Sequence, residues 1–522
     1  MNVRKSFIFL SIIIVFSLIL SKLYWGFLIV GPIVLLGMYD LIQTKHTILR
    51  IYPVIGHFRY FFESIRAEIQ QYFVESNISG RPINREFRAL VYQRAKNELD
   101  TRPYGTQFDV YRSGYEWINH SLSPVHVENV HPRVLFGGPD CDKPYNASPM
   151  NISAMSYGAL SKHAIMALNM GAKLGNFAHN TGEGGLSPYH LKYGGDIIWQ
   201  IGTGYFSCRD QNGFFDRDLF AEKAQLEVVK MIEIKLSQGA KPGHGGILPA
   251  AKLTPEIAEI RHVPMGQDVI SPPSHSAFDS PKGLLEFLSE LRRLSGGKPV
   301  GFKLCIGKKS EFLGICKAML VTGIAPDFIT VDGGEGGTGA APIEFTNSVG
   351  TPLRDAVIFV NNALLGIGLR NKIRIIASAK ILSAFHIARI IALGADTVNS
   401  ARGMMLALGC IQSRSCNTDK CPTGIATQDP ARYKSLDIDT KGLRVSNFHN
   451  LTIANLTELF GACGLNALSE LEPHHIHRRV NGTTTASYDE LYPAVKSLCL
   501  LCDKDIPEMW KHIWEKASAE KW

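Results

Sequence analysis

Short β-branched runs alternate with longer amphipathic runs from Asn151 onward, and glycine- or serine-rich loops lie between them. Repeated strand–loop–helix units predict a parallel sheet, because a parallel neighbour is reached only through a crossover connection. The expected strands are Ile152–Met155, Asn176–His179, Val269–Ser271, Val300–Leu304, Phe328–Val331, Ile373–Ala377 and Thr397–Asn399. Their number favours an α/β fold of the (βα)8 TIM type, with the active site at the C-terminal ends of the strands. The alternative is an open doubly wound sheet, but no G-x-G-x-x-G sequence opens a helix after a first strand.

The chain is longer than such a barrel needs. It has 522 residues, whereas (βα)8 barrels typically have about 250. A polar stretch with helical patterning, interrupted by Pro53 and Pro82, separates the apolar N-terminus from the strand–helix region. We therefore expect a transmembrane anchor at 1–45, a helical connector at 46–144, the barrel at 145–480 and a C-terminal helical extension at 481–522.

The N-terminal segment Phe7–Ile42 is almost continuously apolar, and about 20 apolar residues suffice to cross a bilayer. It can form a hairpin of two short helices, Phe7–Leu20 and Tyr24–Ile42, or one long span. A signal peptide is a third alternative, but a second apolar block follows where a cleavage site would be expected. Basic residues on both sides favour the hairpin, a membrane location and a catalytic domain that faces the cytoplasm. These residues are Arg4, Lys5, Lys45, Arg50, Arg59 and Arg66.

The net charge of +8 does not predict nucleic-acid binding, because lysine and arginine are scattered along the chain. Their local excess between Arg50 and Arg102 follows the apolar segment directly and suits anionic lipid headgroups. The ten cysteines form no evident paired framework. Without a cleavable signal, this indicates a reducing compartment, where cysteine is core filler, catalyst or metal ligand.

Three cysteines lie close together in the run GCIQSRSCNTDKCPTG, and Pro422 directly follows the last of them. Thiolates are the ligands of iron–sulfur clusters, and a Cys-Pro ending is typical of bacterial cluster loops. We therefore expect Cys410, Cys416 and Cys421 to hold a three-iron cluster, or a four-iron cluster with one non-cysteine ligand. A structural zinc ion would need a fourth thiolate or imidazole, and the run contains no histidine. The remaining alternative is three unrelated buried thiols.

Four glycine-rich loops accompany the cysteine run. They are Ser153–Ser161, Asn180–Gly185, Gly239–Gly246 and Asp332–Pro342. The sequence resembles, in order, the FMN-binding synthase domain of glutamate synthase at Ser153–Ser161, Asn180–Gly185, Gly239–Pro249, Ile270–His275, Lys303, Gly336–Pro342 and Gly409–Gln428. The resemblance covers about residues 145 to 480 and includes the cysteine spacing. It implies FMN at the barrel mouth beside a [3Fe-4S] cluster. It also implies that a 2-oxo acid condenses with ammonia and that the flavin delivers a hydride to the imine.

The resemblance also implies a role for individual residues. Met155, Ser156 and Gly158 should pass along the flavin ring, and Lys303 should stabilise negative charge on it. The ribityl chain and ring are expected at Asp332, Gly333, Gly337, Thr338 and Gly339. The phosphate is expected at Ser378, Ala379, Lys380, Ser400, Ala401 and Arg402, which follow the last two strands.

Other positions match residues that hold or face the oxo acid. Glu183, Lys241 and Lys303 are the expected catalytic residues, and Lys241, Arg261 and Ser153 are expected to bind the substrate. A carboxylate near an imine can manage protons, and lysine or arginine can hold a carboxylate. A lysine paired in the barrel core is the alternative for Lys303, and a solvated surface arginine is the alternative for Arg261.

The sequence departs from the family pattern at three places. His244 replaces the usual glutamate, Ile247 replaces the usual glutamine, and Ala379-Lys380 replaces a Gly-Gly phosphate turn. Loss of the amide hydrogen bond at Ile247 means that the substrate need not be 2-oxoglutarate.

Two expected absences concern nitrogen and electrons. Residue 2 is asparagine, so no N-terminal glutaminase with a cysteine nucleophile is expected, and no NAD(P)H domain is recognisable. Electrons would then come from a ferredoxin, a flavoprotein subunit or a membrane quinone pool. The reverse oxidation of an amine or amino acid, as in N-methylglutamate-type enzymes, is an open alternative. So are an α-hydroxy-acid or dihydroorotate-type dehydrogenase and a non-catalytic FMN-binding redox sensor.

Overall fold

The computed structural model describes residues 3–522 and divides the chain into two compact units, with the boundary between Gly80 and Arg81. The first unit is entirely helical. Its elements are α1 (Val3–Leu20), η1 (Tyr24–Gly26), α2 (Phe27–Ile42), α3 (Thr47–Ile51), α4 (Gly56–Ser64), α5 (Arg66–Ile69) and η2 (Gln70–Val74).

Helices α1 and α2 pack against each other, as a hairpin requires. A Cβ atom at Gly37 of α2 would lie 2.0 Å from the ring of Phe7 in α1, so glycine allows the two helices to approach closely. The chain reverses at Lys22, which has a positive φ of 55°. The segments Val3–Leu20 and Tyr24–Ile42 are each long and apolar enough to cross a membrane. The structure therefore has two helices here and not one long helix.

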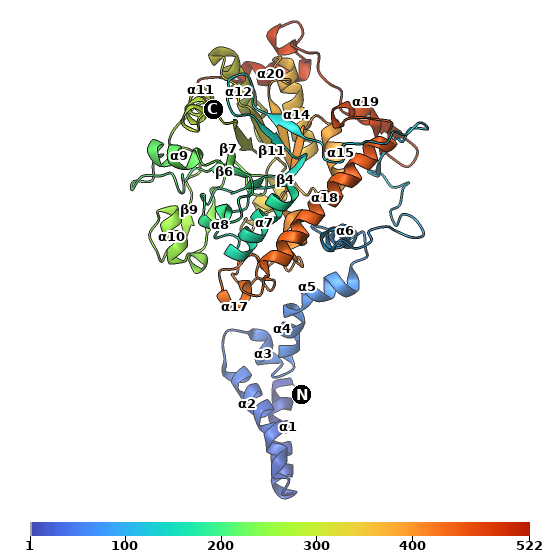
Figure 1. Cartoon of the computed structure of the whole chain (residues 1–522). Coiled ribbons are helices and arrows are strands. Elements are labelled where there is room, and N and C mark those ends of the chain that lie inside the picture. Colours follow the sequence, from blue (N-terminus) through green and yellow to red (C-terminus); the bar gives the residue numbers. More distant parts are fainter. Residues whose placement is uncertain (1–2) are drawn as a thin grey trace. The chain divides into compact units, whose positions relative to one another are not determined.

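The second unit contains a closed barrel of eight parallel strands, which confirms the predicted fold class (Figure 1). The strands are β4 (Met150–Ile152), β5 (His179–Asn180), β6 (Ile197–Ile201), β7 (Val229–Lys235), β10 (Val300–Leu304), β11 (Phe328–Asp332), β12 (Arg374–Ser378) and β13 (Thr397–Ser400). They follow one another around the barrel in chain order, and β13 closes onto β4. This order brings the C-terminal ends of all eight strands to one mouth.

Helices surround the strands (Figure 1). They are α7 (Lys162–Gly175), α8 (Pro188–Leu191), α9 (Arg217–Ala224), α10 (Pro255–Arg261), α11 (Pro281–Leu294), α12 (Lys309–Thr322), α13 (Ile343–Ser348), α14 (Leu353–Gly366), α15 (Ala384–Ala392), α16 (Arg402–Leu408), α17 (Pro430–Tyr433) and α18 (Ile438–Ala462), with η3 (Ala250–Lys252) before α10. Several begin at a serine, threonine or aspartate whose side chain accepts a hydrogen bond from the first turn, as Ser161 does for α7.

Several expected strands differ from the structure, and two strands of the barrel were not expected. Asn176 has left-handed backbone geometry and ends α7, so β5 begins only at His179. The run Val269–Ser271 is outside the barrel, because β9 (Val269–Ile270) pairs antiparallel with β8 (Ile247–Leu248). Strands β6 and β7 were not predicted; polar side chains interrupt both, Gln200 in β6 and Lys230, Glu233 and Lys235 in β7.

The expected helical connector at 46–144 is helical only as far as α6 (Arg85–Lys96), which packs against α16 and α18. Short strands β1 (Glu116–Ile118) and β2 (Val134–Phe136) follow. Strand β2 pairs with β3 (Tyr145–Ala147), and Phe136 packs against Phe328 at the start of β11. This hairpin closes the end of the barrel opposite the mouth, so the segment after Lys96 belongs to the barrel's packing.

The expected C-terminal helical extension is only partly helical. Strand β14 (Ile476–Arg479) pairs with β1 and with β15 (Thr485–Ser487), which makes a small three-stranded sheet. Helical elements η4 (Leu468–Glu470), η5 (Pro473–His475), α19 (Tyr488–Leu491), η6 (Cys499–Leu501) and α20 (Glu508–Lys516) complete the chain. Trp510 of α20 packs on Phe359 of α14 and fixes the C-terminal segment to the barrel.

Candidate active site

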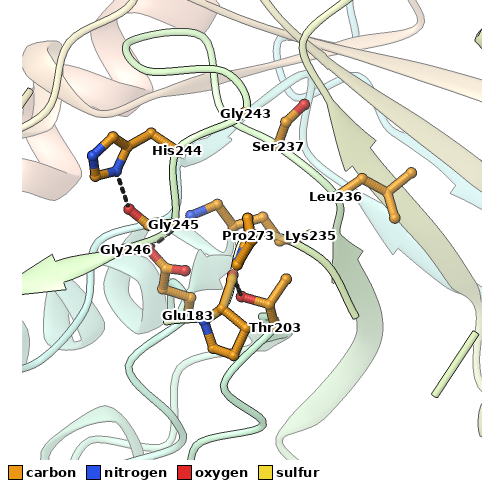
Figure 2. A pocket seen from close by; sticks show the side chains of 11 residues that line it. Glu183, Thr203, Lys235, Leu236, Ser237, Gly243, His244, Gly245, Gly246 and Pro273 are labelled. Atoms are coloured by element: carbon orange, nitrogen blue, oxygen red, sulfur yellow. Dashed lines mark hydrogen bonds and ion pairs between the residues drawn. The ribbon is translucent and has the colours of Figure 1, made fainter. Parts of the chain in front are cut away.

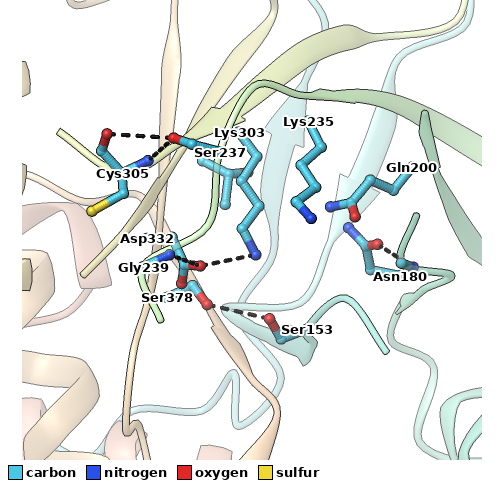
Figure 3. A network of polar contacts seen from close by, with 12 residues as sticks. Ser153, Asn180, Gln200, Lys235, Ser237, Gly239, Lys303, Cys305, Asp332 and Ser378 are labelled. Carbon is cyan, nitrogen blue, oxygen red and sulfur yellow. Dashed lines mark hydrogen bonds and ion pairs between the residues drawn. The ribbon is translucent and has the colours of Figure 1, made fainter. Parts of the chain in front are cut away.

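A lysine–aspartate pair lies at the barrel mouth. Lys303 of β10 places its Nζ atom 3.2 Å from Oδ2 of Asp332 in β11 (Figure 3). The same Asp332 oxygen accepts a hydrogen bond of 2.9 Å from the backbone N–H of Gly239. The Asp332 and Glu233 carboxylates outweigh burial and raise the pKa of Lys303 above its ordinary value. Lys303 is therefore a charged ammonium group held by an ion pair. It is paired with a carboxylate, as the alternative interpretation expected, and it also lies at the barrel mouth.

Three serine residues lie at the ends of neighbouring strands beside this ion pair. Ser153, directly after β4, and Ser378, at the end of β12, place their Oγ atoms 3.2 Å apart (Figure 3). The backbone N–H of Ser153 donates to the carbonyl of Ser400 at 3.2 Å. Hence three residues expected at different sites, one for substrate and two for phosphate, lie side by side at one rim.

Glu233 of β7 lies inside the barrel and was not identified from the sequence. Its carboxylate accepts hydrogen bonds from Asn180 at 2.8 Å, Gln200 at 2.6 Å and Thr330 at 2.5 Å. The group is completely buried, so these three donors replace water as its partners. The signal in the sequence is a glutamate within an otherwise apolar strand run, Met231–Ile234.

A small pocket opens between the loops that follow β5 and β7 (Figure 2). In it, the Lys235 Nζ atom lies 2.7 Å from Oε1 of Glu183. Burial raises the pKa of Glu183, but the nearby cations Lys235, Arg261 and Lys241 lower it below its ordinary value. Glu183 is thus an ionised carboxylate surrounded by positive charge. Lys235 was not predicted, although it ends the strand that carries Glu233.

Lys241 and Arg261 are both buried, so Arg261 is not a solvated surface arginine. Arg261 donates through Nη2 to the carbonyl of Tyr157 at 3.1 Å and lies over the Phe206 ring at 5.0 Å. Burial lowers its pKa to about 10. Burial also lowers the pKa of Lys241, which forms no ion pair within the described chain. The site therefore holds a buried ammonium group without a direct carboxylate partner.

His244 and Ile247, two positions where the sequence departs from the family pattern, differ in their relation to this pocket. His244 lines the pocket, and its Nδ1 atom lies 3.0 Å from the carbonyl oxygen of Gly245 (Figure 2). Its ring also packs edge-on against Phe345 at 5.5 Å. Ile247 is the first residue of β8 and pairs with Ile270, and it is not among the residues that line the pocket. Of the two substitutions, His244 is the one that changes the pocket wall.

The glycine-rich loops need glycine where they approach one another. A Cβ atom at Gly239 would lie 1.8 Å from the carbonyl oxygen of Gly333, and one at Gly245 would lie 2.0 Å from that of Ser271. No side chain fits either position without moving backbone. The loops that follow β7 and β11 therefore meet over the mouth.

The loop expected to pass the flavin ring crosses the same rim. The N–H of Met155 donates to the carbonyl of Asn180 at 3.4 Å. Ser156 and Gly158 follow, and Gly158 has a positive φ of 102° that glycine adopts readily. A Cβ atom at Gly182 would lie 2.9 Å from the Ser156 nitrogen, so this loop also packs tightly against the loop of Glu183.

Cations gather at the ends of β12 and β13. Burial lowers the pKa of Lys380, and the neighbouring charges of Arg81 and Arg402 lower it further, while Glu335 raises it. Lys380 has a positive φ of 47°, which lies in the left-handed region that favours glycine. Three positive groups near backbone amides suit a phosphate. The predicted residues Ala379 and Ala401 lie within this corner, whereas Arg81 was not predicted.

The loop after β11 connects this corner with the cysteine run. Arg402 donates through Nη2 to the carbonyl of Thr338 at 3.2 Å. A Cβ atom at Gly337 would lie 3.0 Å from the same Arg402 nitrogen, and one at Gly339 would lie 3.5 Å from Cβ of Cys416. The residues expected to contact the ribityl chain therefore lie between the phosphate corner and the cysteines.

The three cysteine thiols influence one another. Burial raises the pKa of Cys410, and the charges of Cys416 and Cys421 raise it further. Burial also raises the pKa of Cys421, but hydrogen bonds from Thr423 and from the backbone amides of Ala426, Thr423 and Ile425 lower it below its ordinary value. Backbone donors around a thiolate are typical of iron–sulfur sites. Within residues 3–522, no group of three or more histidine, cysteine, aspartate or glutamate side chains is placed to hold one metal ion, and this includes the three cysteines.

The cysteine run is hydrogen-bonded to the loop expected to carry the flavin. Ser161 donates from its backbone to Ile425 at 2.8 Å and from its hydroxyl to Gly424 at 2.7 Å. Gln428 donates to the carbonyls of Gly158 at 3.0 Å and Leu160 at 2.9 Å. Hydrogen bonds thus join the loops of the two candidate cofactor sites.

Comparison with known proteins decides the family. A model of the conserved region in glutamate synthase matches residues 120–466, well over half of the chain. This chain belongs to the glutamate synthase family. It is 37% identical over 504 residues to the glutamate synthase large subunit-like protein YerD of Bacillus subtilis (strain 168), covering 88% of this chain and 95% of YerD.

Within the glutamate synthase family, the chain also matches the archaeal glutamate synthase (NADPH) of Methanocaldococcus jannaschii. The two are 37% identical over 328 residues, which cover 62% of this chain and 60% of that protein. The chain therefore spans less than two thirds of the archaeal relative. Among solved structures, a mandelate oxidase with benzoyl-formic acid is 15% identical with a TM-score of 0.43, covering 77% of this chain and 98% of that one.

Proposed function

We propose that this chain is an FMN- and iron–sulfur-dependent oxidoreductase that converts a 2-oxo acid and ammonia into an amino acid. The observation that carries this proposal is the surplus of positive charge around Glu183. Lys235 neutralises that carboxylate directly, whereas Lys241 and Arg261 form no ion pair with any carboxylate of residues 3–522. A carboxylate of an incoming oxo acid would supply the missing negative charge.

The residues at the mouth fit the two proposed groups. FMN, when bound, supplies hydride transfer, and an iron–sulfur cluster supplies one-electron transfer. Met155, Ser156 and Gly158 would contact the flavin ring, and the Lys303 ammonium would balance negative charge on it. Lys380, Arg402 and Arg81 would bind the phosphate, and the three clustered cysteines would hold the cluster.

Glu183 and Lys235 have the chemistry to handle protons in this reaction. Loss of water from the adduct of ammonia and the oxo acid requires a proton donor, and the amino acid product needs a proton on nitrogen. Their 2.7 Å ion pair places an acid and a base in one pocket. Oxidation of an amino acid would use the same groups in reverse, so the direction depends on the electron partner.

We also propose that α1 and α2 anchor the protein in a membrane, with the barrel facing the cytoplasm. Exposed aromatic side chains and basic residues follow the two candidate spans in the sequence. Phe58 is 61% exposed, Phe61 55% and Phe62 56%, with Arg59 and Arg66 nearby in sequence. Such a surface suits the interface of an anionic leaflet. A ferredoxin, a flavoprotein or the quinone pool would exchange electrons with the barrel.

Reductive amination can be tested on the detergent-purified chain under anaerobic conditions. Dithionite-reduced methyl viologen would supply electrons, and ammonium with a panel of 2-oxo acids, including 2-oxoglutarate, would be the substrates. We expect mass spectrometry to detect one amino acid product. Because general acid–base groups contribute about 10²–10⁴-fold, Glu183→Gln should lower the rate at least about 100-fold.

Glu311→Gln is the matched control, since Glu311 pairs with the exposed Lys308 and neither residue lines the pocket. It should leave the rate unchanged. A flavin-loaded chain that forms no amino acid from any oxo acid would contradict the proposal. Reduction of the flavin by a 2-hydroxy acid would favour the α-hydroxy-acid dehydrogenase instead, and no turnover of any kind would favour the redox sensor.

A further inference from the structure

Lys252 is a buried lysine to which neither the site nor the proposed reaction gives a role. It ends η3, the short helical turn after β8, and only 3% of its surface is exposed. Its Nζ atom donates to three backbone carbonyls, those of Ala159 at 3.3 Å, Cys416 at 2.9 Å and Ala426 at 2.9 Å. These carbonyls come from the flavin loop and from both sides of Cys421. One ammonium group therefore joins the two loops.

The charge of Lys252 has no direct carboxylate partner. The acidic groups that act on it are Asp419 and the thiols of Cys416 and Cys421, and none forms an ion pair with it within the described chain. Neutral carbonyls satisfy its hydrogen bonds, but a buried ammonium group also needs a compensating negative charge. Thiolates that ligate iron would supply that charge beside it.

We propose that Lys252 is the internal counter-ion of the cysteine-ligated cluster. The hydrogen bonds of Lys252 to Cys416 and Ala159 also hold the cysteine run against the flavin loop. This inference rests on the cluster of the proposed function. A fixed positive charge favours the more negative, reduced form of a neighbouring redox centre. Lys252 therefore raises the reduction potential of the cluster, and burial keeps water from screening the effect.

The test is an EPR-monitored redox titration of the anaerobically purified holoprotein, with iron content measured in parallel. Lys252→Gln removes the charge and keeps two N–H donors, whereas Lys252→Arg keeps both charge and donors. At the potential where the wild-type cluster is half reduced, we expect the ratio of reduced to oxidised cluster in Lys252→Gln to be at least about tenfold lower. For a one-electron couple, this corresponds to a reduction potential lower by about 59 mV. Lys252→Arg should stay close to wild type.

Lys420→Gln is the matched control, because Lys420 is an exposed lysine in the same cysteine run. Water screens the charge of Lys420, so the ratio of reduced to oxidised cluster in Lys420→Gln should differ from wild type by less than about threefold. Equal potentials for Lys252→Gln and wild type, or equal shifts for the glutamine and arginine variants, would overturn the inference. If Lys252→Gln loses its iron, retention of iron by Lys252→Arg supports a charge role and loss by both overturns it. A wild-type chain without iron would instead overturn the proposed cluster itself.

Discussion

Asp332 shows how closely the mouth residues depend on one another. One carboxylate oxygen is shared between the Lys303 ammonium and the Gly239 amide, so it fixes a side chain and a loop at once. Both side chains of the ion pair are nearly buried. Removing one partner leaves an uncompensated charge, which is far costlier than losing an exposed pair.

We therefore predict that Lys303→Met lowers the free energy of unfolding by about 3–5 kcal/mol. The double variant Lys303→Met/Asp332→Asn should recover part of this loss, because it removes the stranded carboxylate. Lys308→Met, on the exposed loop that follows, should change stability by less than about 0.5 kcal/mol. Denaturant titration would measure all three, and equal values for Lys303→Met and Lys308→Met would contradict the buried-pair account.

The residues that the sequence predicted and those that it did not differ in their surroundings. Glu183, Lys241 and Arg261 lie in or beside distinctive loops, and the structure brings them together. Lys235 and Lys252 carry the same kind of charge, but they lie in a β-strand run and a helical turn without a distinctive motif. Their roles come from neighbours that are distant in sequence, which no local pattern contains.

At the scale of elements, helix α6 supports the cysteine run from outside. The hydroxyl of Tyr92 donates to the carbonyl of Cys410 at 2.6 Å. Nearby, the side chain of Gln412 bonds with both the N–H and the carbonyl of Ile83, each at 3.2 Å. The start of the cysteine run is thus held by the first helix of the barrel unit.

We predict that Tyr92→Phe loosens the cysteine run without unfolding the barrel. Loss of one hydrogen bond of about 1 kcal/mol should speed amide hydrogen exchange in residues 410–421 about fivefold. Tyr111→Phe is a suitable control, since Tyr111 is 71% exposed. Hydrogen-exchange mass spectrometry would compare them, and unchanged exchange in Tyr92→Phe would show that α6 does not restrain the run.

The barrel itself could be predicted because most of its strands are apolar and precede glycine-rich loops. Strand β7 could not, since Lys230, Glu233 and Lys235 interrupt its apolar pattern and their partners come from segments that are distant in sequence. The segment after α6 was expected to be helical, yet its strands pair with β3 and β14. Such pairings between distant segments are a tertiary effect that local propensity does not specify.

At the scale of the whole molecule, the boundary after Gly80 separates the apolar helices from a unit that contains its own core. We predict that a chain beginning at Arg81 folds and appears in the soluble fraction, whereas the full chain appears in the membrane fraction. Fractionation followed by circular dichroism would test this. A folded shortened chain that still pelleted with membranes would contradict anchoring by α1 and α2.

Buried histidines should make the barrel unit sensitive to acid. Burial lowers the pKa of His449 from 6.5 to about 4, and its ring packs on Phe177 at 3.9 Å. A lowered pKa means that the folded state prefers the neutral ring. The free energy of unfolding is therefore not reduced by His449 above pH 6.5. It should fall by about 3 kcal/mol as the pH decreases from 6.5 toward 4, because the unfolded state binds the proton more readily.

His449→Gln should therefore lose less stability than wild type between pH 7 and pH 4. Thermal unfolding of the chain that begins at Arg81, followed across this range, would show the difference as a smaller fall in Tm. Parallel curves for the two proteins would mean that His449 does not contribute to the acid response.

We propose that one barrel mouth holds FMN beside a cluster ligated by Cys410, Cys416 and Cys421. The most direct test is absorbance and EPR spectroscopy of the anaerobically purified full chain, with acid-released flavin and iron measured on the same sample. We predict equimolar FMN and a three-iron signal. In Cys416→Ser, the signal and the iron should be lost together while FMN is retained. A colourless, metal-free wild-type protein would contradict the account.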